Sequence, residues 1–88
     1  MNQGKTPRIA IYTTRACSHC RQAKQAMKKW GVRFQEFDIE NNHRAWAEFQ
    51  RLKARGVPVI TVGKRKLFGY DEKRLKKLLE EAGVSLRT

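Results

Sequence analysis

The sequence predicts an α/β fold in which three helices flank a four-stranded mixed sheet, in the order strand, helix, strand, helix, strand, strand, helix. Short runs of apolar, β-favouring residues alternate with longer segments in which apolar residues recur every three or four positions. The first strand–helix–strand unit requires a parallel pair with a right-handed crossover. The last two strands are separated by a two-residue turn, so they pair antiparallel. With 88 residues, the chain is expected to be a single domain with a core at about 8–82.

The first half of the chain predicts a strand, an amphipathic helix and a second strand. Residues 8–12 form a nearly continuous apolar run, as expected for a strand buried on both faces. A helix closed by Gly31 is expected at 18–30, because apolar residues recur there at steps of three and four: Cys20, Ala23, Met27 and Trp30. Residues 32–39 suggest a second strand with imperfect alternation.

A second helix is expected to begin at a cap formed by Asn41 or Asn42 and to end at Gly56. Its apolar face consists of Ala45, Trp46, Phe49 and Leu52. Both tryptophans of the chain, Trp30 and Trp46, fall on such apolar stripes. We therefore expect both of them to belong to the core.

The last third of the chain predicts a hairpin followed by a helix. Strands are expected at 57–62 and 65–68, joined by a tight turn at 63–64. Asp71 can then cap a third helix, and Gly83 lies just past its end. The apolar face of this helix consists of Leu75, Leu78, Leu79 and Ala82.

The composition points to chemistry rather than to a disulfide scaffold or a membrane protein. The only two cysteines are three positions apart, so they cannot form the multi-bridge framework of a small secreted protein. No apolar run has the length of a signal peptide or of a membrane span. We therefore expect a cytoplasmic protein that does not act on membranes.

The candidate catalytic motif is Cys17-Ser18-His19-Cys20. Cys17 lies where the first helix begins, and the unpaired N–H groups and the macrodipole of a helix N-terminus stabilise a thiolate. Cys20 lies one turn later, where it can attack a mixed disulfide formed on Cys17 and release the reduced substrate. A protonated His19, with Arg15 nearby, would favour the thiolate and make the couple more oxidising. We interpret Cys17 and Cys20 as catalytic and Ser18, His19 and Arg15 as tuning residues.

Other uses of the C-x-x-C spacing fit this chain less well. Attachment of a c-type haem needs a histidine where Arg21 stands. A structural zinc site needs four ligands, and His19 is wedged between the cysteines, so no metal is expected. The soft ligand candidates are Cys17, Cys20, His19 and His43. Two interpretations without a functional role stay open. Cys20 could partly be an unreactive core side chain, and His19 could be an ordinary solvent-exposed side chain.

Four short motifs occur in order along the chain: Ile11-Tyr12-Thr13, Cys17-x-x-Cys20 with Ala23-Lys24, Val57-Pro58, and Gly69-Tyr70-Asp71. Their order and spacing resemble those of the glutaredoxins, within the thioredoxin superfamily, over residues 8–82. The resemblance implies a thioredoxin-like fold in which Pro58 is cis and packs beside the cysteines. It also implies the activity of a thiol–disulfide oxidoreductase, which reduces protein disulfides or glutathione mixed disulfides.

The resemblance further implies a site for glutathione, which is the expected co-substrate. The backbone of Val57 could pair with an extended ligand in the manner of a strand. Other parts of glutathione would meet the N–H groups at the start of the third helix and, through the glycyl carboxylate, either Arg51 or Arg55. The residues expected to bind substrate or glutathione are Val57, Pro58, Gly69, Tyr70, Asp71 and Arg51.

Three departures from the family pattern leave the electron donor open. Ser18-His19 stands where most dithiol glutaredoxins have Pro-Tyr, and Thr14 stands where a lysine often precedes the first cysteine. Phe68 replaces one of two adjacent glycines before the last helix. That pattern resembles the short redoxins that accept electrons from thioredoxin reductase and serve ribonucleotide reductase. The electron supply is therefore either a glutathione reductase system or a thioredoxin reductase system.

The net charge of +12 favours anionic partners. The basic runs 64–66 and 73–77, with nearby aromatic residues, suggest a nucleic-acid interface. Basic residues nevertheless line the outer faces of all three helices, as solvated faces do, so we expect weak salt-sensitive binding but no specific nucleic-acid recognition. A better explanation of the positive charge is that it attracts glutathione, which is anionic, or an acidic protein partner. A further alternative is an iron–sulfur cluster held between two chains by Cys17 and glutathione.

Overall fold

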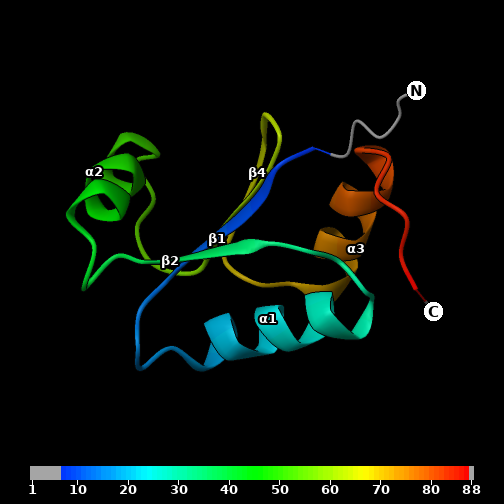
Figure 1. Ribbon diagram of the computed structural model, residues 1–88, viewed down its shortest axis with the longest axis horizontal. Coiled ribbons are helices and arrows are strands. Elements are labelled where there is room, and N and C mark those ends of the chain that lie inside the picture. The colour runs from blue at the N-terminus through cyan, green and yellow to red at the C-terminus, as the bar shows by residue number, and fades with distance from the viewer. Residues whose placement is uncertain (1–6, 88) are drawn as a thin grey trace.

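The computed structural model describes residues 7–87 and has the predicted order of elements (Figure 1). The strands are β1 (Ile9–Thr13), β2 (Gln35–Asp38), β3 (Val59–Val62) and β4 (Arg65–Phe68). The helices are α1 (Ser18–Lys29), α2 (His43–Arg51) and α3 (Glu72–Glu81). Within the described residues, no helix combines the length and the apolar character needed to cross a membrane.

The four strands form one mixed sheet in the order β2-β1-β3-β4. β1 and β2 are parallel, as the strand–helix–strand unit requires, while β3 is antiparallel to both β1 and β4. Tyr12 of β1 is opposite Val59 of β3, which in turn is opposite Phe68 of β4. The last residues of β1, β2 and β4 and the first residue of β3 therefore lie at one end of the sheet, which we call the site end.

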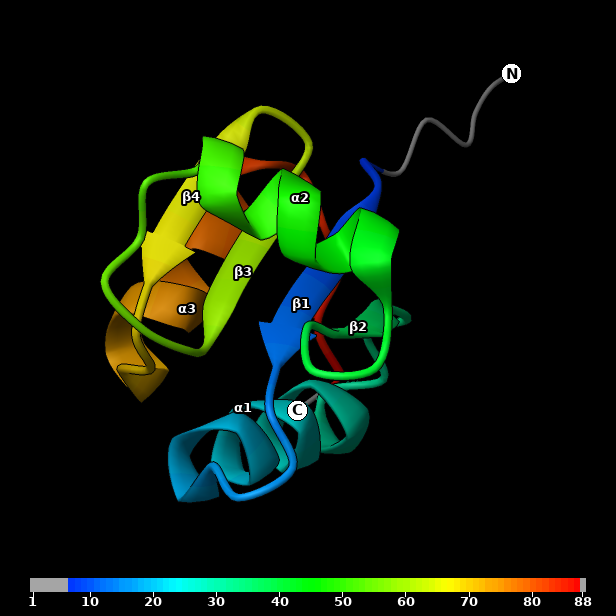
Figure 2. The same cartoon turned by 90° about the vertical axis from the view of Figure 1, so that its left-hand side faces the viewer.

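Helices cover both faces of the sheet, as predicted (Figures 1 and 2). All five residues of β1 are buried, and successive side chains point to opposite faces. Ile11 joins the larger core cluster with Met27 of α1 and Leu75 of α3. Tyr12 belongs to the smaller cluster with Phe49 of α2. Burial on both faces explains why the β1 sequence is almost continuously apolar.

Side-chain caps begin the second and third helices. The side-chain oxygen of Asn42 accepts the N–H of Ala45 at 3.0 Å, so Asn42 rather than Asn41 caps α2. The carboxylate of Asp71 accepts the N–H of Arg74 at 3.1 Å and caps α3 as predicted. These bonds satisfy N–H groups that have no partner within the helix.

The second strand is shorter than the expected 32–39, because the chain first completes the end of α1. Gly31 has a φ of +72°, and the N–H of Val32 donates to the carbonyl of Met27 at 2.8 Å. That N–H is therefore not available to a strand, and β2 begins only at Gln35. The first strand is shifted by one residue from the expected 8–12, because its pairing with β2 extends to Thr13.

The end of α2 and the start of β3 also differ from the prediction. α2 ends at Arg51, well before Gly56, and Lys53 has a left-handed φ of 57° that a helix cannot continue through. The following strand begins at Val59 rather than at residue 57. Pro58 has no N–H to contribute to the ladder, so the pairing starts after it.

The two tryptophans have different environments. Trp30 is 6% exposed and belongs to the core, but Trp46 is 44% exposed, so the prediction that both are core residues is wrong for Trp46. α2 presents Ala45 and Phe49, one helical turn apart, to the interior. Trp46 is rotated by about 100° from Ala45, and it stacks on Phe49 with ring centroids 5.9 Å apart.

Candidate active site

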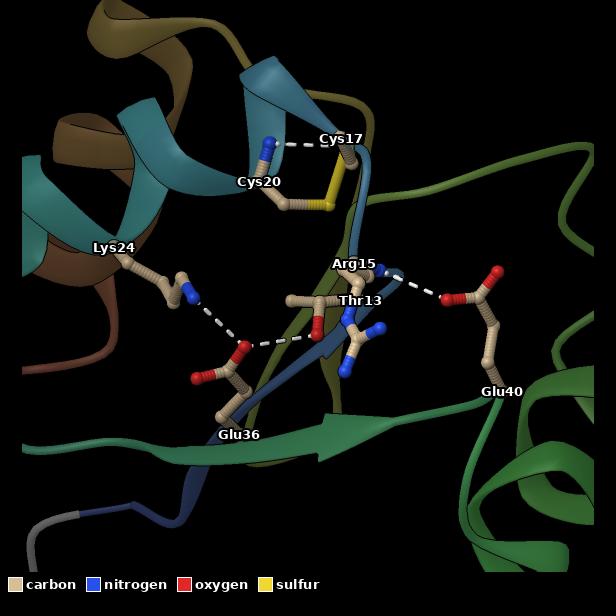
Figure 3. The surroundings of a disulfide bond; sticks show 7 residues. All are labelled: Thr13, Arg15, Cys17, Cys20, Lys24, Glu36 and Glu40. Atoms are coloured by element: carbon tan, nitrogen blue, oxygen red, sulfur yellow. Dashed lines mark hydrogen bonds and ion pairs between the residues drawn. A yellow bond between two sulfur atoms is a disulfide. The ribbon is translucent and has the colours of Figure 1, made fainter.

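The two cysteines lie at the N-terminus of α1 and form a disulfide (Figure 3). Cys17 is the cap residue, with an extended backbone, and its Sγ accepts the N–H of Cys20 at 3.1 Å. The two Cα atoms are 5.2 Å apart. A helix N–H is thus directed at the sulfur of Cys17, which is the arrangement that stabilises a thiolate.

The two cysteines differ in accessibility. Cys20 is 1% exposed and faces the interior, whereas Cys17 is partly exposed. Ser18 and His19, in the first turn of α1, are exposed to solvent. Access decides which sulfur is attacked in thiol–disulfide exchange, so a substrate disulfide can reach Cys17 far more easily than Cys20. Within residues 7–87, no group of three or more His, Cys, Asp or Glu side chains is arranged to hold a metal ion.

Arg15 contacts a carboxylate through its backbone, and its side chain does not approach Cys17. Its backbone N–H donates to Oε1 of Glu40 at 2.9 Å, and Figure 3 shows its guanidinium pointing away from Cys17. Hydrogen bonds from Asn41 and from the N–H of Glu40, with a smaller effect of the Arg15 charge, hold the pKa of Asp38 below its ordinary value. Any tuning of the Cys17 thiolate by Arg15 therefore acts against these neighbouring negative charges, and it stays a prediction.

A polar network that the sequence did not predict lies in the surroundings of the disulfide (Figure 3). Thr13 is 2% exposed, and its hydroxyl donates to Oε2 of Glu36 at 2.9 Å. The same oxygen accepts Nζ of Lys24 at 2.8 Å. The hydrogen bond from Lys24, supported by that from Thr13, lowers the pKa of Glu36 despite partial burial. Since Lys24 lies one turn after Cys20, the network ties the active-site helix to β2.

A cis peptide bond joins Val57 to Pro58, as the resemblance implied. Pro58 is buried, and its carbonyl accepts the N–H of Gly69 at 2.8 Å. This bond connects the start of β3 to the segment before α3. Three of the residues expected to bind substrate or glutathione, Val57, Pro58 and Gly69, are thus brought together at the site end.

The other expected binding residues have varied surroundings. Tyr70 is half-buried against the larger core, and burial, with the nearby charges of Glu72 and Asp71, raises the pKa of its hydroxyl. Asp71 follows it directly, but its carboxylate is already engaged as the cap of α3. Arg51 is an exposed residue at the end of α2.

The structure adds a groove that the sequence did not predict. It has a volume of about 420 Å³ and is lined by Lys53, Ala54, Arg55, Gly56, Val57, Phe68 and Gly69. Phe68 is 56% exposed. Arg55, the alternative to Arg51 as a partner for a carboxylate, lines this groove. The early end of α2 creates it, since residues that were expected to be helical form a loop instead.

These features together define a class of protein. A C-x-x-C disulfide at a helix N-terminus, a cis-proline before the third strand and a mixed sheet in the order β2-β1-β3-β4 make up a thioredoxin-like fold with a dithiol site. The family model described as glutaredoxin matches residues 9–67. The chain therefore belongs to the glutaredoxin family and is a thiol–disulfide oxidoreductase of that type.

Individual relatives agree with this assignment. A glutaredoxin of Pseudomonas aeruginosa is 36% identical over 78 residues, which cover 88% of this chain and 89% of the relative. Glutaredoxin 3 of Escherichia coli K12 is 32% identical over 65 residues, or 73% of this chain and 78% of the relative. Among solved structures, the glutaredoxin-like NrdH-redoxin of Escherichia coli superposes with a TM-score of 0.74 at 27% identity, covering 81% of this chain and 93% of the redoxin.

Proposed function

We propose that this protein reduces protein disulfides or glutathione mixed disulfides, with Cys17 as the attacking thiolate and Cys20 as the resolving thiol. One observation carries the proposal. A partly exposed Cys17, whose sulfur accepts a helix N–H, is paired with a buried Cys20 one turn later. The first position suits attack on an incoming disulfide, and the second suits an intramolecular step that needs no access from solvent.

The reaction consists of two exchanges. The Cys17 thiolate attacks one sulfur of the substrate disulfide, which forms a mixed disulfide and releases the other sulfur as a thiolate that takes up a proton. Cys20, after losing its proton, attacks the sulfur of Cys17, so the second substrate sulfur leaves and the Cys17–Cys20 disulfide forms. The substrate has then gained two electrons and two protons, and an external thiol or reductase must return them to the cysteines.

Glutathione is the proposed co-substrate, and the residues near the cis-proline support it. The backbone of Val57 can pair with an extended tripeptide, while N–H groups from Gly69 to the start of α3 suit a carboxylate. Arg51 or Arg55 would meet a second carboxylate. The net charge of +12 favours such an anionic ligand. We place the reaction in the cytoplasm, where thiols are kept reduced.

A second electron supply is favoured by one comparison. The solved NrdH-redoxin is described as a glutaredoxin-like protein with a thioredoxin-like activity profile. Like Ser18-His19 and Phe68, this likeness supports a redoxin that is reduced by thioredoxin reductase. The chemistry at Cys17 and Cys20 is the same for both supplies, so only the donor differs.

The test is turnover of a glutathione mixed disulfide by the purified protein, with two separate electron supplies. Glutathione with glutathione reductase is one supply, and thioredoxin reductase is the other. Turnover with glutathione establishes the glutaredoxin activity, and turnover only with thioredoxin reductase establishes the redoxin activity. The absence of turnover with both electron supplies would contradict the proposal. The next experiment would then be anaerobic purification, in which a coloured dimer would indicate an iron–sulfur cluster.

Two cysteine variants test the division of roles. Cys17→Ser is expected to abolish turnover of every substrate, because no accessible nucleophile remains. Cys20→Ser is expected to keep part of the activity on glutathione mixed disulfides, since glutathione can resolve the intermediate in place of Cys20. Equal losses in the two variants on that substrate would show that the assignment of attacking and resolving thiols is wrong.

A further inference from the structure

The groove beside the cis-proline extends beyond the residues assigned to glutathione. Lys53, Ala54 and Phe68 contribute to its lining, together with the loop that leads into Pro58. The groove lies at the site end, because Phe68 is opposite Val59 in the hairpin. A polypeptide segment bound there would pass beside the accessible cysteine.

The loop on this side of the active site is basic. The stretch 49–70 contains no Asp or Glu, and its cations before Pro58 are Arg51, Lys53 and Arg55. Lys64, Arg65 and Lys66 lie at the opposite end of the β3–β4 hairpin, and Asp71 and Glu72 follow the stretch directly. Lys53 and Arg55 line the groove itself, and its lining contains no acidic residue. The opposite rim, at the end of β2, carries the carboxylates of Asp38 and Glu40. A ligand with negative charges is therefore attracted to the groove and repelled from the other rim.

The groove also offers an apolar contact. Phe68, in β4, is 56% exposed, the larger exposed fraction of the two exposed large hydrophobic side chains in the described part of the chain. It shares the lining of the groove with Ala54 and Val57. Aromatic side chains are enriched in protein interfaces relative to the rest of the surface. Phe68 therefore suits an apolar side chain of a polypeptide partner.

We propose that this groove docks an acidic segment of a protein substrate, in which carboxylates beside the disulfide-bonded cysteine contact Lys53 and Arg55 and an apolar side chain packs on Phe68. This inference rests on the proposed function and narrows its substrates. Exposed ion pairs are individually weak, so the two contacts together are expected to raise kcat/KM by about threefold to tenfold. Salt should reduce the preference, since the pairs are exposed to solvent.

The experiment compares two peptides that differ only in charge. Each carries one cysteine in a mixed disulfide with 2-mercaptoethanol, next to a leucine and to three aspartates in one peptide or three lysines in the other. Turnover of uncharged bis(2-hydroxyethyl) disulfide measures the proposed function without the groove. Binding of both peptides with serine in place of cysteine, measured by calorimetry, reports docking without chemistry.

Charge-reversal variants locate the effect. Lys53→Glu with Arg55→Glu should abolish or invert the preference for the acidic peptide. The matched control is Lys64→Glu with Arg33→Glu, which changes the charge equally at exposed positions away from the site end. The control should keep the preference. Phe68→Ser should weaken binding of both peptides, because each carries the leucine.

The outcomes separate the inference from the function on which it rests. Equal kcat/KM for the two peptides, with normal turnover of the small disulfide, would overturn the docking inference and leave the oxidoreductase proposal intact. The docking inference would also be overturned if the Lys64→Glu, Arg33→Glu control lost the preference for the acidic peptide while the Lys53→Glu, Arg55→Glu variant kept it. Selective binding of the acidic serine peptide without any turnover would support docking while contradicting the proposed reaction. Neither binding nor turnover would contradict both.

Discussion

The buried hydroxyl of Thr13 gives a stability prediction that can be worked out from the structure. Thr13 is 2% exposed, and its hydroxyl donates to Glu36, which also accepts Nζ of Lys24. Glu36→Leu removes the acceptor and leaves the hydroxyl buried without a partner. Thr13→Val removes the donor instead and leaves the carboxylate paired with Lys24. The double variant removes both groups.

The expected losses of stability follow from the exposure of each group. An unsatisfied buried hydroxyl costs about 1–3 kcal/mol, and an exposed ion pair contributes roughly 0.2–1 kcal/mol. Glu36→Leu should therefore destabilise the fold by about 1–4 kcal/mol, and Thr13→Val by about 0.5–1.5 kcal/mol. The double variant has no buried hydroxyl without a partner. The stability that it loses should therefore be smaller than the sum of the two single losses by roughly 1–3 kcal/mol.

The assay is equilibrium unfolding in urea of the reduced protein, with the four free energies of unfolding forming a double-mutant cycle. An unchanged denaturant dependence in all four proteins would allow the midpoints to be compared directly. Lys28→Leu, at an exposed position of α1 without an ion pair among the described residues, is the matched surface control. If the loss of stability in the double variant equals the sum of the two single losses within about 0.5 kcal/mol, the reasoning is refuted. That result would indicate that water reaches the hydroxyl.

The same network predicts a dependence of stability on pH. The pKa of Glu36 is lowered, chiefly by the hydrogen bond from Lys24. The unfolded state therefore binds the proton more readily than the folded state does. The stabilisation is complete above the ordinary carboxyl pKa and disappears as the pH falls through the lowered folded value. In Glu36→Gln, the free energy of unfolding should therefore depend less on pH in this acidic range. An unchanged pH dependence there would show that other carboxylates cause it.

Three further predictions concern local structure and are checked by thermal unfolding. Asp71→Ala should cost about 1 kcal/mol by removing the α3 cap, and therefore lower Tm by about 4–8 °C, whereas Asp71→Asn should retain most of the stability. Met27→Ala, at a site with 0% exposure, should cost about 2–5 kcal/mol; a smaller loss would mean that the core collapses around the cavity. Gly69→Ala should cost about 1–2 kcal/mol through its φ of +87° alone, since no atom lies within 4 Å of the added methyl group.

The cysteine site could be predicted from the sequence because its signals are local. A strand, a turn and an amphipathic helix follow one another within the stretch 8–30, and the first cysteine falls at their junction. The caps of α2 and α3 are local as well, since Asn42 and Asp71 bond to N–H groups three residues later. Signals of this kind need no knowledge of how distant segments meet.

Contacts that depend on strand register could not be predicted in the same way. Glu36 meets Thr13 only because β1 and β2 pair with Tyr12 opposite Phe37, which is a non-local alignment. The exposure of Trp46 has a similar origin. Its apolar character matches the core stripe of α2, but the direction in which the helix faces Tyr12 selects Ala45 and Phe49 instead.

The charge asymmetry of the active site arises from the order of the strands. The first four acidic residues of the chain lie between 36 and 48, and the following stretch 49–70 has none. Because β1 lies between β2 and β3, the carboxylates at the end of β2, Asp38 and Glu40, and the basic loop before β3 reach the site end on opposite sides of the strand that leads to Cys17. The net charge of +12 brings anionic molecules toward the protein, but it carries no information on direction. Orientation at Cys17 comes instead from the separation of charges, which the net charge alone cannot reveal.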